Sequence, residues 1–429
     1  MTLSPSNDSK LIIKEYFEKN YSKQEKFIPG KSKIPLAIPP YSWQEVCEAL
    51  DSMLSMQTTM GKKVKKFEES FAKYIGSKYA IMVNSGSSAN LLALSVLSNP
   101  SFGSGIIKKG NKIIPPATTW VTTVYPIVSI GAKPVFVDIE MGTYNIDTQK
   151  IEKAITKKTK AIMLVHLLGY PCNMTQIKNI AKKHNLLLIE DTCESHGAEF
   201  NGKKVGSFGD LSTFSFFASH HITTMEGGML VTNNPKIYEL GKSIRTFGWT
   251  RDLKNKKTLE KKYSNIDTRY LFLNMGFNMR PTEIQGAFGI HQIKKLDHLV
   301  KRRIENADYF YTKLNSFSDY LLLPPQRKKY KNSFLVFPIT VIENKYFNKN
   351  QIVDNLEKHG IETRQVVAGN IVQQPVINQF SYRISGDLKN SEYVMKNSFV
   401  IGIHDGIDNE RRNYISQIIA EFISKKTKS

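Results

Sequence analysis

Short apolar runs alternate with helix-like stretches from about Tyr79 onward, and no other feature of the sequence constrains the fold as strongly. The runs are YAIMVN, NKIIPP, KPVFVDI, KAIMLVHLL, NLLLIED and STFSFF, and Gly, Pro or Asp punctuates them, as is typical of buried strands. Between them lie the helix-like stretches SANLLALSVL, TWVTTVYPIVSI and MTQIKNIAKKH. The alternation predicts an α/β fold in which helices cover both faces of a mostly parallel sheet.

The pattern loosens in a lysine-rich segment at residues 241–275, and a helical period returns at residues 293–315. The last hundred or so residues predict strand SFLVFPITV, helix NKNQIVDNLEKHG closed by Gly360, strands IETRQVV and FVIGIH, and helix DNERRNYISQIIAEFIS. We therefore expect three parts, which are an N-terminal extension (residues 1–34) with a short amphipathic helix, a large domain (residues 35–292) and a smaller α+β domain (residues 293–429).

Composition narrows the class of protein. The 429 residues are 41% hydrophobic and 23% charged, as in ordinary globular proteins, and we find neither a signal-peptide pattern nor an apolar stretch of membrane-spanning length. The three cysteines, Cys47, Cys172 and Cys193, lack metal-binding spacing and suit a reducing compartment. We expect a cytoplasmic protein without a membrane partner.

The formal net charge of +22 has two interpretations. Lysine-rich faces bind nucleic acids, but here the lysines are scattered, and no helix-turn-helix or zinc-finger spacing accompanies them. A solvated basic surface, or attraction for an anionic ligand, explains the charge better. We expect no nucleic-acid partner.

Two strand ends carry groups suited to an anionic, planar ligand. In NSGSSANLLAL (residues 84–94), a Gly-Ser-Ser turn opens a helix, where N–H groups, hydroxyls and the helix dipole favour phosphate. An ordinary N-cap is the alternative. In LLLIEDTCESHGA (residues 186–198), a strand ends in Glu190-Asp191, where an aspartate can pair with a protonated pyridine nitrogen. A solvated or capping acid is the alternative there.

Two further stretches contain residues that suit a cofactor site. PPATTWVTTVYP places Trp120 near a helix start, where it can stack on a planar cofactor, although a core tryptophan is the commoner explanation. SFFASHHITTMEGG (residues 215–228) places Ser215 on a strand before the adjacent His220 and His221. A histidine pair is more often structural or a metal ligand, but no third ligand spacing supports a metal, so we expect none.

Taken in order, these motifs resemble the fold-type I pyridoxal phosphate enzymes, and specifically the sugar aminotransferase family called the DegT, DnrJ, EryC and StrS group. The likeness runs from about Pro35 to the C-terminal helix and includes TMGKKVKKFEESFAKYIGSKYAIMVNSGSSAN, KPVFVDIEMGTYNID, LIEDTCESHGAEFNGKKVGSFGD and MGFNMRPTEIQGAFGIHQI. It implies that the cofactor phosphate contacts Gly86, Ser87, Ser88 and Ser215. It also implies that Trp120 stacks on the cofactor ring and that Asp191 pairs with the pyridine nitrogen.

The resemblance also implies a shared site between two subunits. Asn278, in the G-x-N-x-R pattern, matches a position that reaches the phosphate of the neighbouring subunit, which implies a homodimer. Glu194 stands where the family's aminotransferases carry glutamine and is expected to hydrogen-bond the ring hydroxyl of the cofactor.

His220 stands where those aminotransferases carry the Schiff-base lysine. Imidazole forms no stable neutral imine, but with an ordinary pKa of about 6.5 it both takes and gives protons. The same replacement is typical of the 3-dehydratases of nucleotide-linked 4-keto-6-deoxysugars within the family. The resemblance therefore implies non-covalent pyridoxal or pyridoxamine phosphate, C3 dehydration of GDP-4-keto-6-deoxy-D-mannose, and His220 as base and then acid.

The resemblance extends to the second substrate and to electron transfer. It implies L-glutamate as amino donor, with Arg251 in GWTRD as the candidate for its carboxylate, because arginine binds carboxylates bidentately. Arg364 in TRQVVAGN is a substrate-binding candidate, and His221 is expected to orient His220 or to pack. A related branch of the family carries an iron–sulfur cluster on later cysteines, but no cysteine follows Cys193, so we expect no cluster.

Two alternatives stay open at this point. One is a nucleotide-sugar aminotransferase in which Lys203 or Lys204 replaces the missing lysine. The other is a non-catalytic, cofactor-binding protein.

Overall fold

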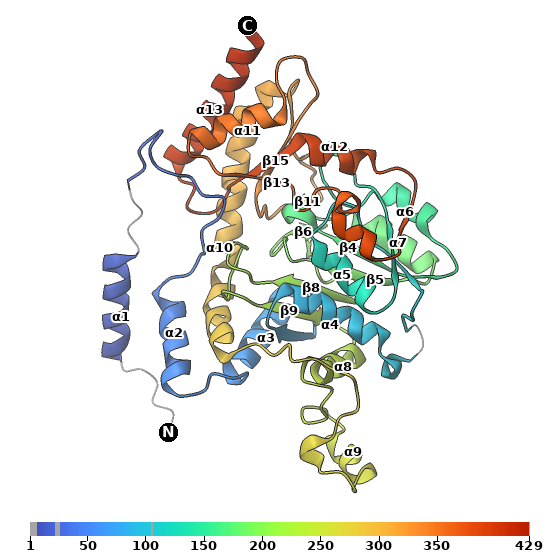
Figure 1. The fold of residues 1–429 in the computed structure, drawn as a ribbon. Coiled ribbons are helices and arrows are strands. Elements are labelled where there is room, and N and C mark those ends of the chain that lie inside the picture. Colours follow the sequence, from blue (N-terminus) through green and yellow to red (C-terminus); the bar gives the residue numbers. More distant parts are fainter. Residues whose placement is uncertain (1–6, 22–25, 104–105, 429) are drawn as a thin grey trace.

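An eight-stranded sheet forms the centre of the computed structural model, which describes residues 7–21, 26–103 and 106–428 (Figure 1). In order across the sheet, the strands are β1 (Tyr79–Val83), β9 (Gly228–Thr232), β8 (Leu211–Ser215), β5 (Leu187–Asp191), β4 (Thr159–Val165), β2 (Lys112–Ile114), β3 (Lys133–Phe136) and β14 (Arg383–Ile384). β9 is antiparallel to both of its neighbours, and the pairs from β8 to β14 are parallel. The predicted α/β fold with a mostly parallel sheet is confirmed.

Helices cover both faces of this sheet because side chains alternate along each buried strand. On one face lie α4 (Gly86–Ser98), α5 (Val121–Ser129) and α8 (Pro235–Arg245). On the other lie α3 (Lys62–Ile75), α6 (Thr148–Ala154), α7 (Met174–Lys183) and α10 (Glu283–Leu314). In β1, Ile81 and Val83 pack against the first group, whereas Ala80 and Met82 pack against the second.

The long helix α10 begins ten residues before the predicted helical period, and its N-terminal cap explains the difference. The Thr282 hydroxyl accepts a hydrogen bond from the Gln285 backbone N–H, and the Gln285 side chain accepts one from the Thr282 backbone N–H. This reciprocal capping stabilises a first turn that the apolar period does not reveal. α10 crosses residue 292, the expected domain boundary, and the division into domains stays a prediction.

A second, antiparallel sheet lies in the C-terminal part of the chain. Its strands, in order, are β10 (Leu321–Leu322), β12 (Phe337–Val341), β15 (Ser398–Ile401) and β13 (Thr363–Gln365). Its core includes side chains from α10, α11 (Lys349–Lys358) and α13 (Asn409–Lys428). Gly360 follows α11 with a φ of +75°, a left-handed conformation that favours glycine at a helix end.

Other helices lie outside these layers. α1 (Asn7–Asn20) is the expected N-terminal helix and lies against α2 (Trp43–Leu54), and α9 (Lys256–Lys262) lies in the lysine-rich segment, far from the sheet (Figure 1). α12 (Lys389–Asn397) precedes β15. Within the described ranges, none of the helices combines the length and the apolar character needed to cross a bilayer.

The segment between β8 and β9, the third and second strands from one edge of the large sheet, is a long hairpin. Ser215 pairs with Gly228 at its base, and the Phe216 N–H donates to the Gly227 carbonyl at 2.9 Å. The Thr223 N–H donates to the Gln292 side chain of α10 at 2.9 Å. His220 therefore lies on a loop that is tied to the sheet at both ends and to α10 at Thr223.

Candidate active site

A cavity of about 460 Å³ opens at the carboxyl ends of β4, β5 and β8. These strands are parallel, so their last residues, Val165, Asp191 and Ser215, meet at one edge, where open α/β sheets bind ligands. Residues of the second sheet close the other side. The predicted site residues that line the cavity are Gly86, Ser87, Trp120, Asp191, Glu194, Ser215, His220 and Arg364.

The start of α4 forms an anion cradle in this cavity. A Cβ atom on Gly86 would lie 2.4 Å from Ser215 Cβ, so only glycine lets the helix start approach β8 this closely. Ser87 and Ser215 face the cavity from the two elements. The free N–H groups of the first turn, the helix dipole and these hydroxyls suit a phosphate group.

Ser88 is placed differently from its neighbour Ser87. Its backbone N–H donates to the N-cap hydroxyl of Ser85 at 3.1 Å, and the two hydroxyls are 3.0 Å apart. Ser88 is not among the residues that line the cavity. Its side chain thus belongs to the helix cap, the alternative noted for this turn.

Asp191 is held in one orientation by side chains from two helices. Its Oδ2 accepts hydrogen bonds from Asn90 Nδ2 at 2.9 Å and Thr123 Oγ1 at 2.8 Å, and its Oδ1 accepts from the Cys193 N–H at 3.2 Å. The Asn90 oxygen in turn accepts from Thr213 Oγ1. The carboxylate is thus fixed at the cavity wall, where it can balance a cationic ring nitrogen.

Trp120 and Glu194 lie on the wall of the same cavity. Trp120 is the N-cap residue of α5 and is 54% exposed, so it is not the core tryptophan of the alternative interpretation. Glu194 Oε2 accepts a hydrogen bond from the Leu168 N–H at 2.8 Å. Burial raises the pKa of Glu194 to about 7, so near neutral pH this carboxyl group both donates and accepts hydrogen bonds.

His220 is among the residues that line the cavity. Its Nδ1 is buried without a hydrogen-bond partner among the described residues. Burial, and then the positive charge of Arg303, lower the pKa of His220 to about 4. The ring is therefore neutral at pH 7 and able to accept a proton.

Three further predicted residues lie at or beyond the edge of this cavity. His221 is fully buried behind it, with Nε2 3.1 Å from the Ser333 carbonyl oxygen. Arg251 and Asn278 line a separate cavity of about 520 Å³. There the Arg251 guanidinium stacks on Trp249 at 4.2 Å, and Asn278 Oδ1 accepts from Arg280 Nε at 2.9 Å.

Several residues that contribute to the cavity were not singled out from the sequence. Asn90 and Thr123 anchor Asp191, and the signal that could have found them is a polar side chain on an otherwise apolar helix. Other cavity-lining residues are direct neighbours of predicted ones, and these are Ser85, Thr119, Cys193, Ser219 and Gln365.

Comparison with known proteins identifies the family. The profile of the DegT/DnrJ/EryC1/StrS aminotransferase family matches residues 42–420. The chain belongs to this family. GDP-4-keto-6-deoxy-D-mannose 3-dehydratase of Escherichia coli O55:H7 is 42% identical over 371 residues, which cover 85% of this chain and 94% of that protein.

Two solved structures of GDP-4-keto-6-deoxymannose-3-dehydratase have the same fold as this member of the DegT/DnrJ/EryC1/StrS family. One contains a trapped PLP-glutamate geminal diamine, and the other, a variant, contains bound GDP-perosamine. Each has a TM-score of 0.84 and 39% identity, and each match covers 90% of this chain and 99% of the other.

An aminotransferase of this family would need a lysine in the cavity, and none of the lining residues in the described part of the chain is one. Lys203 and Lys204 lie on β7 (Lys203–Lys204), in a small sheet with β6 (Glu199–Phe200) and β11 (Tyr330–Lys331). Lys203 Nζ donates to the Ser207 carbonyl at 3.0 Å, and Lys204 Nζ lies 4.6 Å from the Tyr74 ring. Neither lysine lines the cavity that contains His220.

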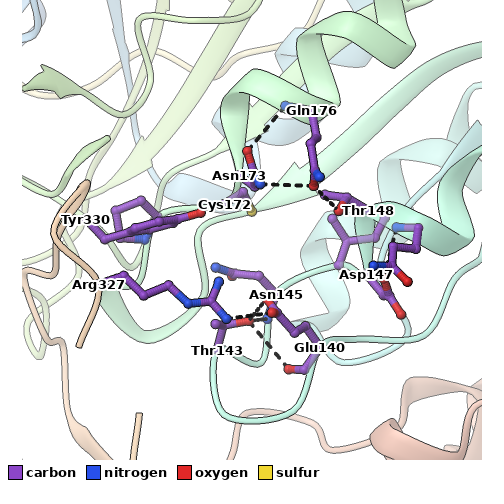
Figure 2. A pocket seen from close by; sticks show the side chains of 13 residues that line it. Glu140, Thr143, Asn145, Asp147, Thr148, Cys172, Asn173, Gln176, Arg327 and Tyr330 are labelled. Carbon is purple, nitrogen blue, oxygen red and sulfur yellow. Dashed lines mark hydrogen bonds and ion pairs between the residues drawn. The ribbon is translucent and has the colours of Figure 1, made fainter. Parts of the chain in front are cut away.

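A third cavity, of about 320 Å³, is lined mainly by polar side chains, and Figure 2 shows them paired with one another. Arg327 contacts Glu140 at 2.7 Å, and the Thr148 hydroxyl donates to Gln176 Oε1 at 2.6 Å. None of the predicted site residues lines it. Over the described ranges, we also find no group of three His, Cys, Asp or Glu side chains placed to hold a metal ion.

Proposed function

We propose that the protein is a PLP/PMP-dependent 3-dehydratase of a nucleotide-linked 4-keto-6-deoxyhexose, with GDP-4-keto-6-deoxy-D-mannose as its substrate. The observation that carries the proposal is His220, which lines a cavity that otherwise suits a pyridoxal-type cofactor. The named relatives that act on this GDP-sugar support the choice of nucleotide and sugar.

The cavity residues fit the cofactor. The α4 cradle of Gly86, Ser87 and Ser215 suits its phosphate, Asp191 suits its ring nitrogen, and Trp120 suits its ring face. When bound, the cofactor supplies an electron sink and an amine. Without a lysine, these contacts hold it non-covalently, and Glu194 hydrogen-bonds its ring hydroxyl.

His220 has the properties of a base that later acts as an acid. Its lowered pKa keeps the ring neutral at pH 7, which is the proton-accepting form. Once protonated in this partly buried position, the ring gives its proton up readily, because desolvation and Arg303 both disfavour the charged form. It can then protonate the C3 hydroxyl group of the sugar as that group leaves as water.

We propose L-glutamate as the amino donor, supported by the glutamate adduct of PLP in a structure of a relative. Arg251 and Arg364 are the candidates for binding the anionic groups of glutamate and the sugar nucleotide.

Since no cysteine follows Cys193, we propose that the enzyme works without an iron–sulfur cluster. The cysteines are unpaired, which suits a reducing compartment, and we propose a cytoplasmic location on that ground.

We also propose a homodimer with shared sites. Large apolar side chains are exposed close to Asn278 in the sequence, on the segment before α10, namely Phe272, Met275 (93% exposed) and Phe277. Exposed apolar side chains gathered in this way favour protein contact. If a partner subunit binds this surface, Asn278 and Arg251 come to lie next to the active-site cavity of the partner. This supports the proposed contact between Asn278 and the cofactor phosphate in the partner's site.

The proposed function is tested by incubating the protein with PLP, glutamate and GDP-4-keto-6-deoxymannose. We expect the sugar nucleotide to lose one oxygen atom in mass while 2-oxoglutarate forms, and a His220→Asn variant to do neither. An aminated sugar product would contradict the proposal and favour the aminotransferase. CDP and dTDP ketosugars in parallel assays test the nucleotide.

Borohydride treatment separates the remaining alternatives. Wild-type protein with PLP is expected to give no covalent adduct, because imidazole forms no reducible imine, whereas His220→Lys is expected to give one. A lysine adduct in the wild type would favour the aminotransferase. PLP binding without turnover of any ketosugar would favour the non-catalytic protein.

A further inference from the structure

Three histidine rings lie together at the wall of the candidate active site, with His220 lining the cavity and His196 and His221 behind it. The His196 ring centroid is 5.5 Å from that of His221 and 6.3 Å from that of His220. His196 and His221 are fully buried. Both ring nitrogens of His196, and the Nδ1 atoms of His220 and His221, are buried without a hydrogen-bond partner in the described part of the chain. Buried polar groups in native proteins are nearly always paired, so this cluster requires an explanation.

The contact of His221 with Ser333 determines where the proton of His221 lies. Its Nε2 is 3.1 Å from the Ser333 carbonyl oxygen, which only accepts hydrogen bonds, so Nε2 carries the hydrogen. Burial, followed by the charge of Arg303, lowers the pKa of His221 well below its usual range, so the ring is neutral. Its Nδ1 therefore presents a lone pair to the interior.

The proposed role of His220 requires one particular tautomer. Because Nδ1 is buried, Nε2 is the nitrogen that can serve the cavity, and as a base it must be free of hydrogen. A neutral imidazole has one N–H, so Nδ1 must carry it. A buried N–H needs an acceptor, and the opposite tautomer would turn a donor toward the cavity and abolish the base.

The surroundings leave few candidates for that acceptor. Phe71, Phe214 and Phe216 pack around the His196 ring and offer no lone pair of an oxygen or nitrogen. Arg303, the charged group that faces the cluster from α10, can only donate, and its Nη1 already contacts the carbonyls of residues 334 and 335. Among the ring nitrogens of the cluster, those of His196 and the Nδ1 of His221 are buried without a partner in the described part of the chain, and a neutral imidazole has one nitrogen that accepts.

We propose that His196 and His221 are positioning residues that accept the Nδ1 proton of His220 through one shared buried water, and so keep its Nε2 free to act as the base. No pair of their nitrogens is close enough for a direct hydrogen bond, and a polar separation of this kind is commonly bridged by water. A buried water makes about three hydrogen bonds, which matches three rings. The inference rests on the proposed function of His220.

Paired variants test the inference at His221. Leu is apolar and close in size, whereas Asn keeps a hydrogen-bonding group near the position of Nδ1. We expect His221→Leu to lower kcat about tenfold or more with an unchanged KM for the sugar nucleotide, and His221→Asn to recover most of that loss. At position 196 we likewise expect His196→Leu to have a lower kcat than His196→Asn. Equal kcat in the Leu and Asn variants of both positions would overturn the inference.

A direct measurement of the tautomer keeps the test independent of turnover. In the full-length protein labelled with ¹⁵N-histidine, the signals of His220 are those missing from His220→Asn. We expect them to show hydrogen on Nδ1 in the wild type and a population with hydrogen on Nε2 in His221→Leu. Hydrogen on Nε2 in the wild type would overturn the inference. A wild type with hydrogen on Nδ1 but no dehydratase activity would instead reject the proposed function alone.

Discussion

Asn90 Nδ2 donates a hydrogen bond to Asp191 Oδ2 at 2.9 Å, and the same amide accepts one from Thr213 Oγ1. One side chain of α4 thus ties the carboxylate on β5 to β8. Because the bond is made to a charged group, its loss is worth roughly 1.5–3 kcal/mol and also frees Asp191 to rotate.

We therefore expect Asn90→Ala to weaken PLP binding about tenfold or more, measured by absorbance titration. Asn234→Ala is the matched control, because Asn234 caps α8 away from the cavity. It should lower stability by about 1 kcal/mol and leave PLP affinity unchanged. Equal PLP affinity in the wild type and Asn90→Ala would show that Asp191 needs no such anchor.

Ser87 and Ser88 are adjacent but lie in different environments. Ser87 lines the cavity and Ser88 contributes to the cap of α4. We expect Ser87→Ala to raise the dissociation constant of PLP about tenfold, and Ser88→Ala to change it by less than about twofold. Titration of both variants with PLP measures the two dissociation constants. A larger increase in Ser88→Ala than in Ser87→Ala would place the phosphate on Ser88.

Glu194 makes the stability of the cofactor-free protein depend on pH. Burial raises its pKa to about 7 in the folded chain, above the usual value for glutamate, so folding favours the protonated form. The stabilisation is fully present below about pH 4.5 and is lost as the pH rises through about 7.

We therefore expect Glu194→Gln to gain stability over the wild type as the pH rises, by up to roughly 3 kcal/mol at about pH 8. Urea unfolding at about pH 5 and about pH 8 measures the difference. Glu69→Gln, on the exposed surface of α3, is the control and should show none. A difference that shrinks with pH would mean that the Glu194 carboxylate is stabilised in the fold.

Asn278 is predicted to act in the neighbouring subunit, and mixed dimers test this. His220→Asn and Asn278→Asp are each expected to be inactive alone. Co-expressed, half of the dimers are mixed, and each holds one intact site, so about a quarter of wild-type activity should return. If Asn278 served its own subunit, mixing would restore nothing.

The fold, and the residues at the carboxyl ends of the strands, could be predicted well from the sequence. Single polar residues mark where the apolar strands end. Asp191 ends its strand as expected, Ser215 lies on its strand as expected, and the two residues meet at one cavity. The start of α10 was harder to predict from the sequence, because a capping box at Thr282 extends the helix beyond its apolar period.

Side-chain direction was harder to predict than position. Ser87 and Ser88 are equivalent in composition, and only the geometry of the first helical turn separates the cavity residue from the cap residue. The anchors Asn90 and Thr123 lie 101 and 68 residues from Asp191, so their contact depends on the packing of α4 and α5 on the sheet. His221 was left between orienting and packing, and its contact with Ser333 comes from a segment 112 residues away.

The hairpin between β8 and β9 has a consequence for how such chains change their chemistry over evolutionary time. Its ends are paired at Ser215 and Gly228 and its loop is bonded to α10, so the backbone at His220 is held by contacts that do not involve the His220 side chain. A single exchange at this position therefore changes the side chain at the cavity while these backbone contacts stay in place. We therefore expect exchanges at residue 220 to change the proposed reaction more readily than they change the backbone that supports it.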